Sequence, residues 1–385
     1  MIPYGKQDIN QEDINEVVSV LQSNFLTQGP QVPLFEKTIS EYCGSKYSVA
    51  VNSATSALHI ACLALNLGDE DWLWTSPNSF VASSNCGIYC GARIDFVDID
   101  PKTYNLSIES LEKKLVQAKK NNKLPKILVA VHFAGQSCEM KKIHMLSKKY
   151  GFRIIEDASH AIGGRYLDSP VGGCEYSDIA VFSFHPVKII TTAEGGIANT
   201  NSKELFEKME LFRSHGVTRN PELMTKNTEG AWYYQQIDLG FNYRMTELQA
   251  ALGISQMKRL DEFVSKRHSL QERYDLLLKN LPIIKPYQQE NIYSSLHLYP
   301  IQIVLNKVKK TRQQIFNELR ESGIGVNVHY IPIHMQPYYQ QLGFNEGDFP
   351  NSEDYYSQAI TIPLFHSMSL SQQDEVIEKL NMILK

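Results

Sequence analysis

The chain of 385 residues has no long apolar run and no excess of one charge. Nothing approaches the roughly 20 apolar residues that a membrane-spanning helix needs. The formal net charge is only -4, which favours neither nucleic acid nor an anionic membrane as a partner. The stretch that starts at Met1 has neither the basic start nor the apolar middle of a signal peptide. We therefore expect a cytoplasmic protein that binds no nucleic acid and no membrane.

Cysteine is scarce, and its spacing follows no metal-binding pattern. The six cysteines are scattered along the sequence. Cys86 and Cys90 have the spacing of one helix face, but no nearby pair of histidines or cysteines completes a set of metal ligands. We therefore expect buried free thiols and no metal site.

Strand and helix patterns alternate through the N-terminal part of the sequence. Short apolar runs predict strands at residues 49–52, 92–97, 127–132, 152–157 and 179–182. Helical spacing of apolar residues predicts helices at residues 10–21, 32–43, 106–119 and 140–150. Strands separated by helices are typical of a mostly parallel sheet with right-handed crossovers. We therefore predict a large doubly wound α/β domain over residues 1–249.

The pattern changes near residue 250. Thr246 and Gln249 have the spacing of a capping box that opens a long helical stretch toward Leu281, with a bend expected near Gly253. Beyond it, strands are expected at 299–305 and 326–330, and helices at 311–322, 354–359 and 370–384. We predict a smaller C-terminal α+β domain over residues 250–385.

A lysine and an aspartate follow two of the predicted strands. Lys188 lies just after the strand 179–182, and Asp157 ends the strand 152–157. The carboxyl ends of strands in open α/β sheets face the ligand crevice. A single lysine in a turn is usually a solvated side chain. Together with a carboxylate it can serve pyridoxal phosphate (PLP), because the amine bonds to the cofactor and the carboxylate keeps the pyridine nitrogen protonated. The pair therefore indicates a PLP enzyme.

Small hydroxyl residues follow the strand 49–52, in the segment Ser53-Ala54-Thr55-Ser56. Such residues at a helix start usually serve as N-caps. The free amides and the positive end of the helix dipole also form a phosphate site. This segment alone leaves both interpretations open.

Four segments in this order carry a family resemblance. They are Ser53 to Leu58, Glu156-Asp157-Ala158-Ser159-His160, Ser183-Phe184-His185-Pro186-Val187-Lys188, and Phe241-Asn242-Tyr243-Arg244. With them the chain resembles the DegT/DnrJ/EryC1/StrS family of fold-type I, PLP-dependent aminotransferases, which act on nucleotide-linked keto sugars. The segment 191–196 and the length are most similar to members that aminate C4 of a UDP-linked 4-keto-6-deoxy-N-acetylhexosamine in pseudaminic acid biosynthesis.

The resemblance implies roles for individual residues. Lys188 would hold the cofactor and carry the proton, and Asp157 would pair with the pyridine nitrogen. Asn242 would reach the cofactor phosphate of the neighbouring subunit, which implies an obligate homodimer with shared active sites. Phe80 would stack on the cofactor and His160 would lie beside its ring oxygen, although a core phenylalanine and a structural histidine remain alternatives. The cofactor phosphate would be bound by Ser183, Ala54, Thr55 and Ser56.

The resemblance also implies a pocket for the sugar nucleotide. Its lining would be Tyr4, Asn24, Phe25, Leu26, Thr27, Asn327, Val328, His329 and Tyr330. The alternatives for these segments are a disordered terminus, a plain loop after a helix and an edge strand.

We therefore expect an aminotransferase that moves an amino group, with glutamate as donor, to the UDP-linked sugar. The same chemistry on a dTDP-linked 3-keto or 4-keto sugar is the nearest alternative. A PLP-binding regulator is another, although regulators of this type carry an added DNA-binding domain. An ordinary amino-acid transaminase would need an arginine for the second carboxylate of its substrate, and the sequence does not place one.

Overall fold

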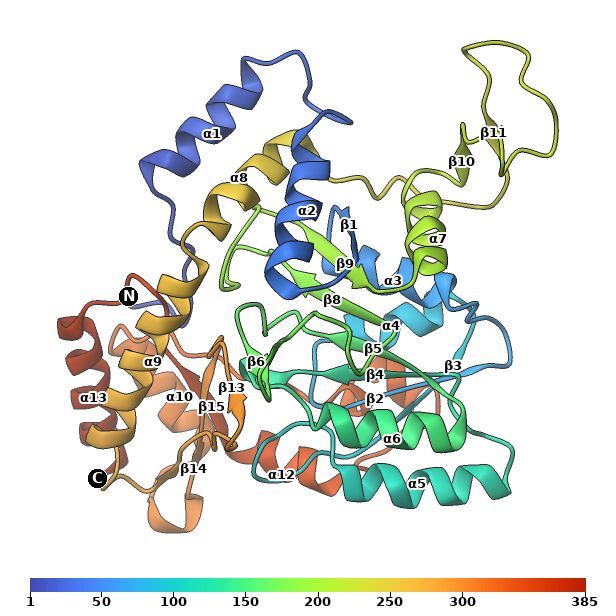
Figure 1. Cartoon of the computed structure of the whole chain (residues 1–385). Coiled ribbons are helices and arrows are strands. Elements are labelled where there is room, and N and C mark those ends of the chain that lie inside the picture. Colours follow the sequence, from blue (N-terminus) through green and yellow to red (C-terminus); the bar gives the residue numbers. More distant parts are fainter.

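A seven-stranded β-sheet forms the centre of the computed structural model, which describes residues 1–385 (Figure 1). The strand order is β1-β9-β8-β5-β4-β2-β3. Strand β9 runs antiparallel to its neighbours β8 and β1, and the other neighbouring strands pair in parallel. The predicted mostly parallel sheet is therefore confirmed. The strands are β1 (Tyr47–Val51), β2 (Trp72–Thr75), β3 (Arg93–Phe96), β4 (Ile127–Val131), β5 (Arg153–Asp157), β8 (Ile179–Ser183) and β9 (Gly196–Thr200).

Helices cover both faces of the sheet (Figure 1). Alternate residues of β4 belong to different cores: Val129 packs with residues of α3 and α7, whereas Leu128 packs with residues of α5 and α6. This alternation is what a strand buried on both faces requires. One face carries α3 (Ala54–Ala64), α4 (Ala82–Tyr89) and α7 (Lys203–Arg213), and the other carries α2 (Gln31–Cys43), α5 (Ile108–Lys120), α6 (Met140–Tyr150) and α8 (Glu247–Met257).

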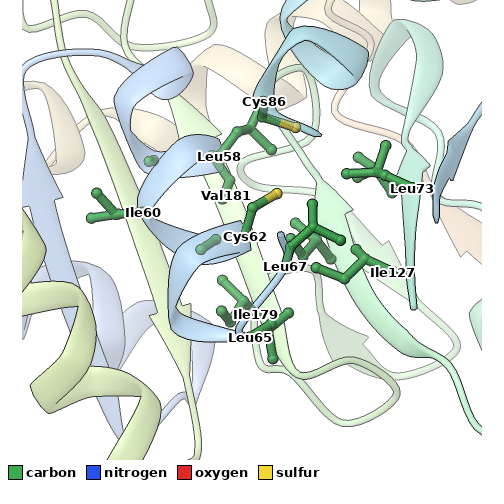
Figure 2. Close-up of a cluster of buried hydrophobic side chains, with 14 of the residues drawn as sticks. Leu58, Ile60, Cys62, Leu65, Leu67, Leu73, Cys86, Ile127, Ile179 and Val181 are labelled. Atoms are coloured by element: carbon green, nitrogen blue, oxygen red, sulfur yellow. The ribbon is translucent and has the colours of Figure 1, made fainter. Parts of the chain in front are cut away.

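Helix α3 lies in the middle of the largest apolar core (Figure 2). Leu58 and Cys62 point from it toward the sheet, and Cys86 of α4 lies beside them. Truncating a buried leucine of this kind to alanine costs roughly 2–5 kcal/mol. All six cysteines are free and five of them are buried, which confirms the predicted buried thiols with Cys90 as the partly exposed member.

The C-terminal part forms a second core, on the left of Figure 1. Tyr274 of α9 and Tyr299 of β14 are fully buried in it, together with Val376 of α13. Its elements are α9 (Leu260–Leu277), β12 (Ile283–Ile284), β14 (Tyr299–Ile303), α10 (Arg312–Glu321), β15 (Ala359–Ile362) and α13 (Leu370–Leu384). Two further helices of this part pack elsewhere: Tyr339 of α11 (Pro337–Gln340) belongs to the core around α3, and Tyr355 of α12 (Pro350–Gln358) belongs to a small cluster with Tyr104 and Phe133.

Helix α8 begins at the expected boundary but packs with the large sheet. Its residues Ala250 and Met257 belong to the same core as Phe182 of β8. Helix α9 then passes from that core, at Phe263, to the C-terminal core, at Tyr274. The boundary between residues 249 and 250 stays a prediction.

The expected bend near Gly253 is wrong, because α8 continues to Met257 and the break falls at residues 258–259. Gly253 is used for close packing instead: a Cβ there would lie 2.6 Å from the ring of Phe35. At the break, the guanidinium of Arg259 donates hydrogen bonds to Asp8 (2.6 Å) and to Asp13 (2.7 Å).

The expected strand 326–330 is also wrong. Only an isolated bridge between Asn327 and Thr361 forms there. The side-chain oxygen of Asn327 accepts a hydrogen bond from the backbone N–H of Val328 (2.9 Å), and such local bonds compete with a strand ladder. The segment instead turns toward the carboxyl edge of the large sheet.

The N-terminal residues contact both the C-terminal part and helix α8, which packs with the large sheet. Ile2 pairs with Ile324, and the backbone oxygen of Tyr4 accepts a hydrogen bond from Leu364 N (3.1 Å). Helix α1 (Gln11–Leu21) packs on α8, where the buried Asp13 accepts a hydrogen bond from Gln256 Nε2 (2.7 Å). Tyr4 is thereby held at a defined place.

Short strands complete the fold. The hairpin of β10 (Val217–Thr218) and β11 (Gln235–Gln236) extends away from the body of the molecule (Figure 1). A small separate sheet consists of β6 (Arg165–Tyr166), β7 (Ser169–Pro170) and β13 (Ile292–Tyr293). None of the helices combines the length and the apolar character that crossing a membrane requires.

Candidate active site

A cavity of about 440 Å³ opens at the carboxyl edge of the large sheet. The segments that follow β1, β2, β5 and β8 line it, together with Tyr4 and residues 327–330. This is where open α/β sheets bind ligands, because the carboxyl ends of their parallel strands meet at one edge.

Lys188 and Asp157 line the same cavity, as predicted from their strands. Asp157 is the last residue of β5, and Lys188 follows the neighbouring parallel strand β8. The Asp157 carboxylate is oriented by its neighbours. Its Oδ2 accepts a hydrogen bond from Ser83 Oγ (2.6 Å), and its Oδ1 accepts one from Ser159 N (3.2 Å).

The amine of Lys188 is prepared to act as a nucleophile. Burial lowers the pKa of Lys188 to about 8, although the nearby Asp157 carboxylate raises that pKa. A lysine with this pKa carries an unprotonated amine much more often at neutral pH than a solvated lysine does.

The N-terminus of α3 offers free donors to the cavity. Ser53 caps the helix by accepting a hydrogen bond from Ser56 N (3.1 Å). No group of the chain accepts a hydrogen bond from the N–H of Ala54 or of Thr55. Both residues line the cavity, as do Ser53 and Ser183. The cap and the anion site therefore coexist, because they use different N–H groups of the same helix end.

Ser56 differs from the other predicted phosphate residues. Its hydroxyl donates to Asn52 Oδ1 (2.7 Å), and the side chain is buried outside the cavity lining. Its N–H is taken by the cap of Ser53. The phosphate role of Ser56 thus stays a prediction with no support from the geometry.

Gly196 lets β9 approach the start of α3. A Cβ at this position would lie 2.4 Å from Ala54 N and 2.5 Å from the carbonyl carbon of Ser53. Backbone atoms cannot yield at such distances, so only glycine preserves this helix end.

Phe80 lies open to the cavity. Its side chain is 61% exposed and it belongs to the cavity lining, so the alternative of a core phenylalanine is wrong. A free aromatic face beside Lys188 and Asp157 suits a planar heteroaromatic ring.

His160 lines the cavity, and both of its ring nitrogens have protein partners. The N–H of Ala134 donates to Nδ1 (3.3 Å), and Nε2 lies 3.2 Å from the hydroxyl of Tyr330. Burial lowers the pKa of His160 well below its usual value, and Lys188 lowers it further. The neutral ring therefore carries its proton on Nε2 and donates it to Tyr330, which leaves the tyrosine hydroxyl hydrogen free for a ligand.

The predicted sugar-nucleotide residues separate into two groups. Tyr4 and the segment Asn327, Val328, His329 and Tyr330 line the cavity. The rings of Tyr4 and His329 lie 5.2 Å apart, so the alternatives of a disordered terminus and an edge strand are wrong. In contrast, Asn24, Phe25, Leu26 and Thr27 are exposed outside the cavity lining, and so is Asn242.

Comparison with known proteins agrees with this geometry. The sequence matches the profile of the DegT/DnrJ/EryC1/StrS aminotransferase family over residues 7–381. The chain belongs to this family. It is 37% identical over 387 residues to the spore coat polysaccharide biosynthesis protein SpsC of Bacillus subtilis, with 100% of this chain and 97% of that protein covered.

A relative with a named activity and a solved structure are also similar to this chain over its full length. A UDP-4-amino-4,6-dideoxy-N-acetyl-beta-L-altrosamine transaminase of Campylobacter jejuni (strain 81-176) is 37% identical over 390 residues, covering 100% of this chain and 98% of that protein. The structure of Helicobacter pylori PseC, an aminotransferase of pseudoaminic acid biosynthesis, superposes with a TM-score of 0.90 at 34% identity, covering 100% and 99% of the two chains.

The cofactor of this family fits the residues present. The aminotransferase Spr1654 of Streptococcus pneumoniae has solved PLP and PMP forms, with TM-scores of 0.89 and 0.90 at 28% identity, covering at least 99% of this chain and 98% of those chains. PLP is therefore the cofactor of this aminotransferase. The residues that would hold it line one cavity: Lys188 would be its covalent anchor, Asp157 would pair with its nitrogen, and the start of α3 with Ser183 would offer donors to its phosphate.

Replacing Gly196 by alanine is expected to weaken PLP binding at least tenfold, because the new methyl group displaces the N–H groups of Ala54 and Thr55. Titration of the apoprotein with PLP measures this. Gly68→Ala is the matched control, because a Cβ there meets nothing within 4 Å. Equal affinity of Gly196→Ala and Gly68→Ala would contradict the role of this helix end.

The rate at which PLP attaches to the apoprotein is expected to rise about tenfold per pH unit up to a pH near 8 and then to level, because only the unprotonated Lys188 reacts. Stopped-flow absorbance measures the rate. In Asp157→Asn the levelling should occur at lower pH, since the carboxylate that raises the pKa is gone. A rate that still rises at pH values above 9 would contradict the lowered pKa.

Some residues of the site were not predicted from the sequence. Ser83, which binds Asp157, lies in α4, and no pattern in that segment indicates a site. His297 lies at the start of an apolar strand segment and also lines the cavity. His185 and Glu194 flank Lys188, so the motif itself could have indicated them, and their side chains approach to 4.0 Å.

Proposed function

We propose that this aminotransferase moves an amino group from glutamate to C4 of a UDP-linked 4-keto-6-deoxy-N-acetylhexosamine in the cytoplasm. The observation that carries the proposal is the composition of the cavity. Its wall includes Tyr4, Asn327, His329 and Tyr330, and no arginine contributes to the lining. Hydroxyl, amide and aromatic groups suit a sugar and its base, whereas a dicarboxylic acceptor would need an arginine fork.

The chain's own residues carry out the proton transfers. When bound, PLP supplies the electron sink that stabilises negative charge on the reacting carbon. Asp157, held by Ser83 and Ser159, would keep the pyridine nitrogen protonated. The amine of Lys188, the one lysine of the cavity lining, would carry the proton that leaves the α-carbon of the amino donor. In the overall exchange, glutamate would become 2-oxoglutarate with uptake of one water, and the ketone of the sugar would become an amine with release of one water.

The active site is proposed to need two chains. Asn242 is exposed and lies outside its own cavity, as expected for a residue that reaches the cofactor phosphate of a neighbouring subunit. Phe25 and Leu26 are 52% and 50% exposed, and Leu239, close to Asn242, is 73% exposed. Exposed apolar groups of this kind mark protein interfaces.

A second acceptor is supported by the comparisons. SpsC, named for spore coat polysaccharide biosynthesis, is as similar to this chain as the altrosamine transaminase of C. jejuni. A different nucleotide-linked 3-keto or 4-keto sugar is therefore the alternative acceptor.

The test offers glutamate with UDP-linked and dTDP-linked keto sugars and locates the new amine by NMR of the product. Amine at C4 of the UDP-linked sugar is expected, with weak reaction of the free sugar and competition by UDP, because binding energy comes from the remote nucleotide. Lys188→Ala is the control for enzymatic transfer. Amine at C3, or preference for the dTDP sugar, would replace the proposed acceptor.

A further inference from the structure

His297 is a buried histidine of the cavity wall with no hydrogen-bond partner for its ring. It lies just before β14 and is 4% exposed. Nδ1 is sealed from solvent without a partner. No group of the chain contacts Nε2 within hydrogen-bond distance either, so Nε2 is the nitrogen available to the cavity that His297 lines.

This lack of partners is unusual within the molecule. Every other buried histidine has a hydrogen bond from its ring to the protein, as shown by His59 with Tyr243, His132 with Glu156, His160 with Tyr330, His329 with Thr361 and His334 with Glu353. Buried polar groups nearly always have a partner, because water has been removed from them. The exception is therefore expected to find its partner in a ligand.

The ring is held firmly in place. It packs on the ring of His160 with centroids 4.4 Å apart. Behind it, the buried Arg267 donates a hydrogen bond to the backbone oxygen of His297 (3.2 Å). Ser295 Oγ donates to the backbone oxygen of His160 (2.7 Å), which ties the two segments together. The direction of the ring is thus set before a ligand arrives.

The ring is also uncharged. Burial lowers the pKa of His297 well below its usual value, and the neighbouring His160, Lys188 and Arg267 lower it further. A neutral imidazole suits a neutral oxygen, such as a hydroxyl or an acyl oxygen, better than a diphosphate.

The polar groups of PLP already have other partners. Its phosphate is assigned to the start of α3 and Ser183, its nitrogen to Asp157, and its ring oxygen to the side of His160 and Tyr330. We infer that His297 binds the sugar of the acceptor, by a hydrogen bond from Nε2 to a neutral oxygen of the hexose, and thereby contributes to the choice of sugar. This inference rests on the proposed function.

The test compares three substitutions that keep different parts of the ring. His297→Gln places an amide near the position of Nε2, His297→Asn places one near Nδ1, and His297→Phe keeps only the ring shape. The two half-reactions are followed separately by single-turnover spectroscopy, with the UDP-linked keto sugar as acceptor and glutamate as donor. His144→Gln, on α6 and outside the cavity lining, is the control.

We expect the apparent KM for the acceptor to rise about tenfold in His297→Phe and His297→Asn, as for one lost hydrogen bond, and to stay within about threefold in His297→Gln. Cofactor content and the glutamate half-reaction should remain within about twofold of the parent. If His297→Phe does not fold, the acceptor KM values of His297→Gln and His297→Asn still test the Nε2 contact.

Any one of four results would overturn the inference. An unchanged acceptor KM in His297→Phe, or equal KM values for the Gln and Asn variants, excludes the Nε2 contact. Equal loss in both half-reactions or loss of cofactor assigns His297 to PLP instead. If the parent enzyme aminates no nucleotide-linked keto sugar, the proposed function itself fails, and this outcome is seen in the parent before any variant is compared.

Discussion

Lys188→Ala is expected to lose transaminase turnover by at least about 10³-fold, together with the visible absorbance of covalently held cofactor. In the proposed mechanism the amine is both the anchor of PLP and the group that moves the proton, and proton transfer by a positioned side chain alone contributes about 10²–10⁴-fold. No second lysine lines the cavity, so no neighbour can replace it. Absorbance spectra and steady-state rates with glutamate and the keto sugar measure both losses.

The control for this prediction is His185→Gln, which changes a partly exposed neighbour on the same turn. It should keep both the colour and most of the turnover. A colourless but active Lys188→Ala variant would remove Lys188 from the mechanism, whatever the cofactor content.

Mixing two inactive variants tests the shared site. Lys188→Ala lacks the proposed anchor, and Asn242→Asp would repel the phosphate of the neighbouring subunit's cofactor if the site is shared as proposed. In a mixed dimer, one of the two sites combines an intact Lys188 with an intact Asn242, so activity should return to as much as about a quarter of the parent value. Activity that stays absent after subunit exchange, or full activity of a proven monomer, would contradict the two-chain site.

Asp157→Asn is expected to keep most of its cofactor and to lose about 10²- to 10³-fold in turnover, the range found when one electrostatic contact is removed from a closed site. The amide cannot hold a proton on the pyridine nitrogen, so the cofactor withdraws electrons poorly. Cofactor content from absorbance and the rate of each half-reaction distinguish binding from catalysis.

Ser83→Ala provides a graded companion to this variant. It removes the 2.6 Å hydrogen bond to Asp157 Oδ2 and keeps the carboxylate itself. Its turnover should fall about tenfold or less, with both half-reactions affected alike. If Asp157→Asn turns over at the parent rate, Asp157 is not the partner of the nitrogen.

The sequence predicted those parts of the site that depend on the edge of the sheet. Lys188 and Asp157 each follow an apolar run that predicts a strand. Parallel strands have their carboxyl ends at one edge of the sheet, so the two residues could be placed near each other from the predicted strands alone. The cap of Ser53 was equally local. Ser83 and His297 could not be predicted, because their roles depend on contacts across 74 and 137 residues, to Asp157 and to His160.

The two errors in the predicted fold have different origins, a distant contact at Gly253 and a local side-chain bond at Asn327. Gly253 is typical of a helix break, but its small size is required by Phe35, 218 residues away along the chain. The segment 326–330 has the composition of a strand, yet the side chain of Asn327 binds its own backbone. Asn24 to Thr27 and Asn242 were predicted from the resemblance, and one chain alone leaves them outside the cavity.

The residues that line the cavity range along the sequence from Tyr4 to Tyr330. This separation has a consequence for folding. The turn that bears Lys188 is closed by local bonds, such as Phe184 N to Gly195 O (2.9 Å), and can form with its hairpin. The complete pocket exists only after the N-terminal segment has docked against Ile324 and the segment 327–330 has reached the sheet. Because the unfolded chain lacks this pocket, bound PLP is expected to stabilise the entire folded state by mass action. Retention of PLP therefore reports whether the N-terminal segment and residues 327–330 have docked.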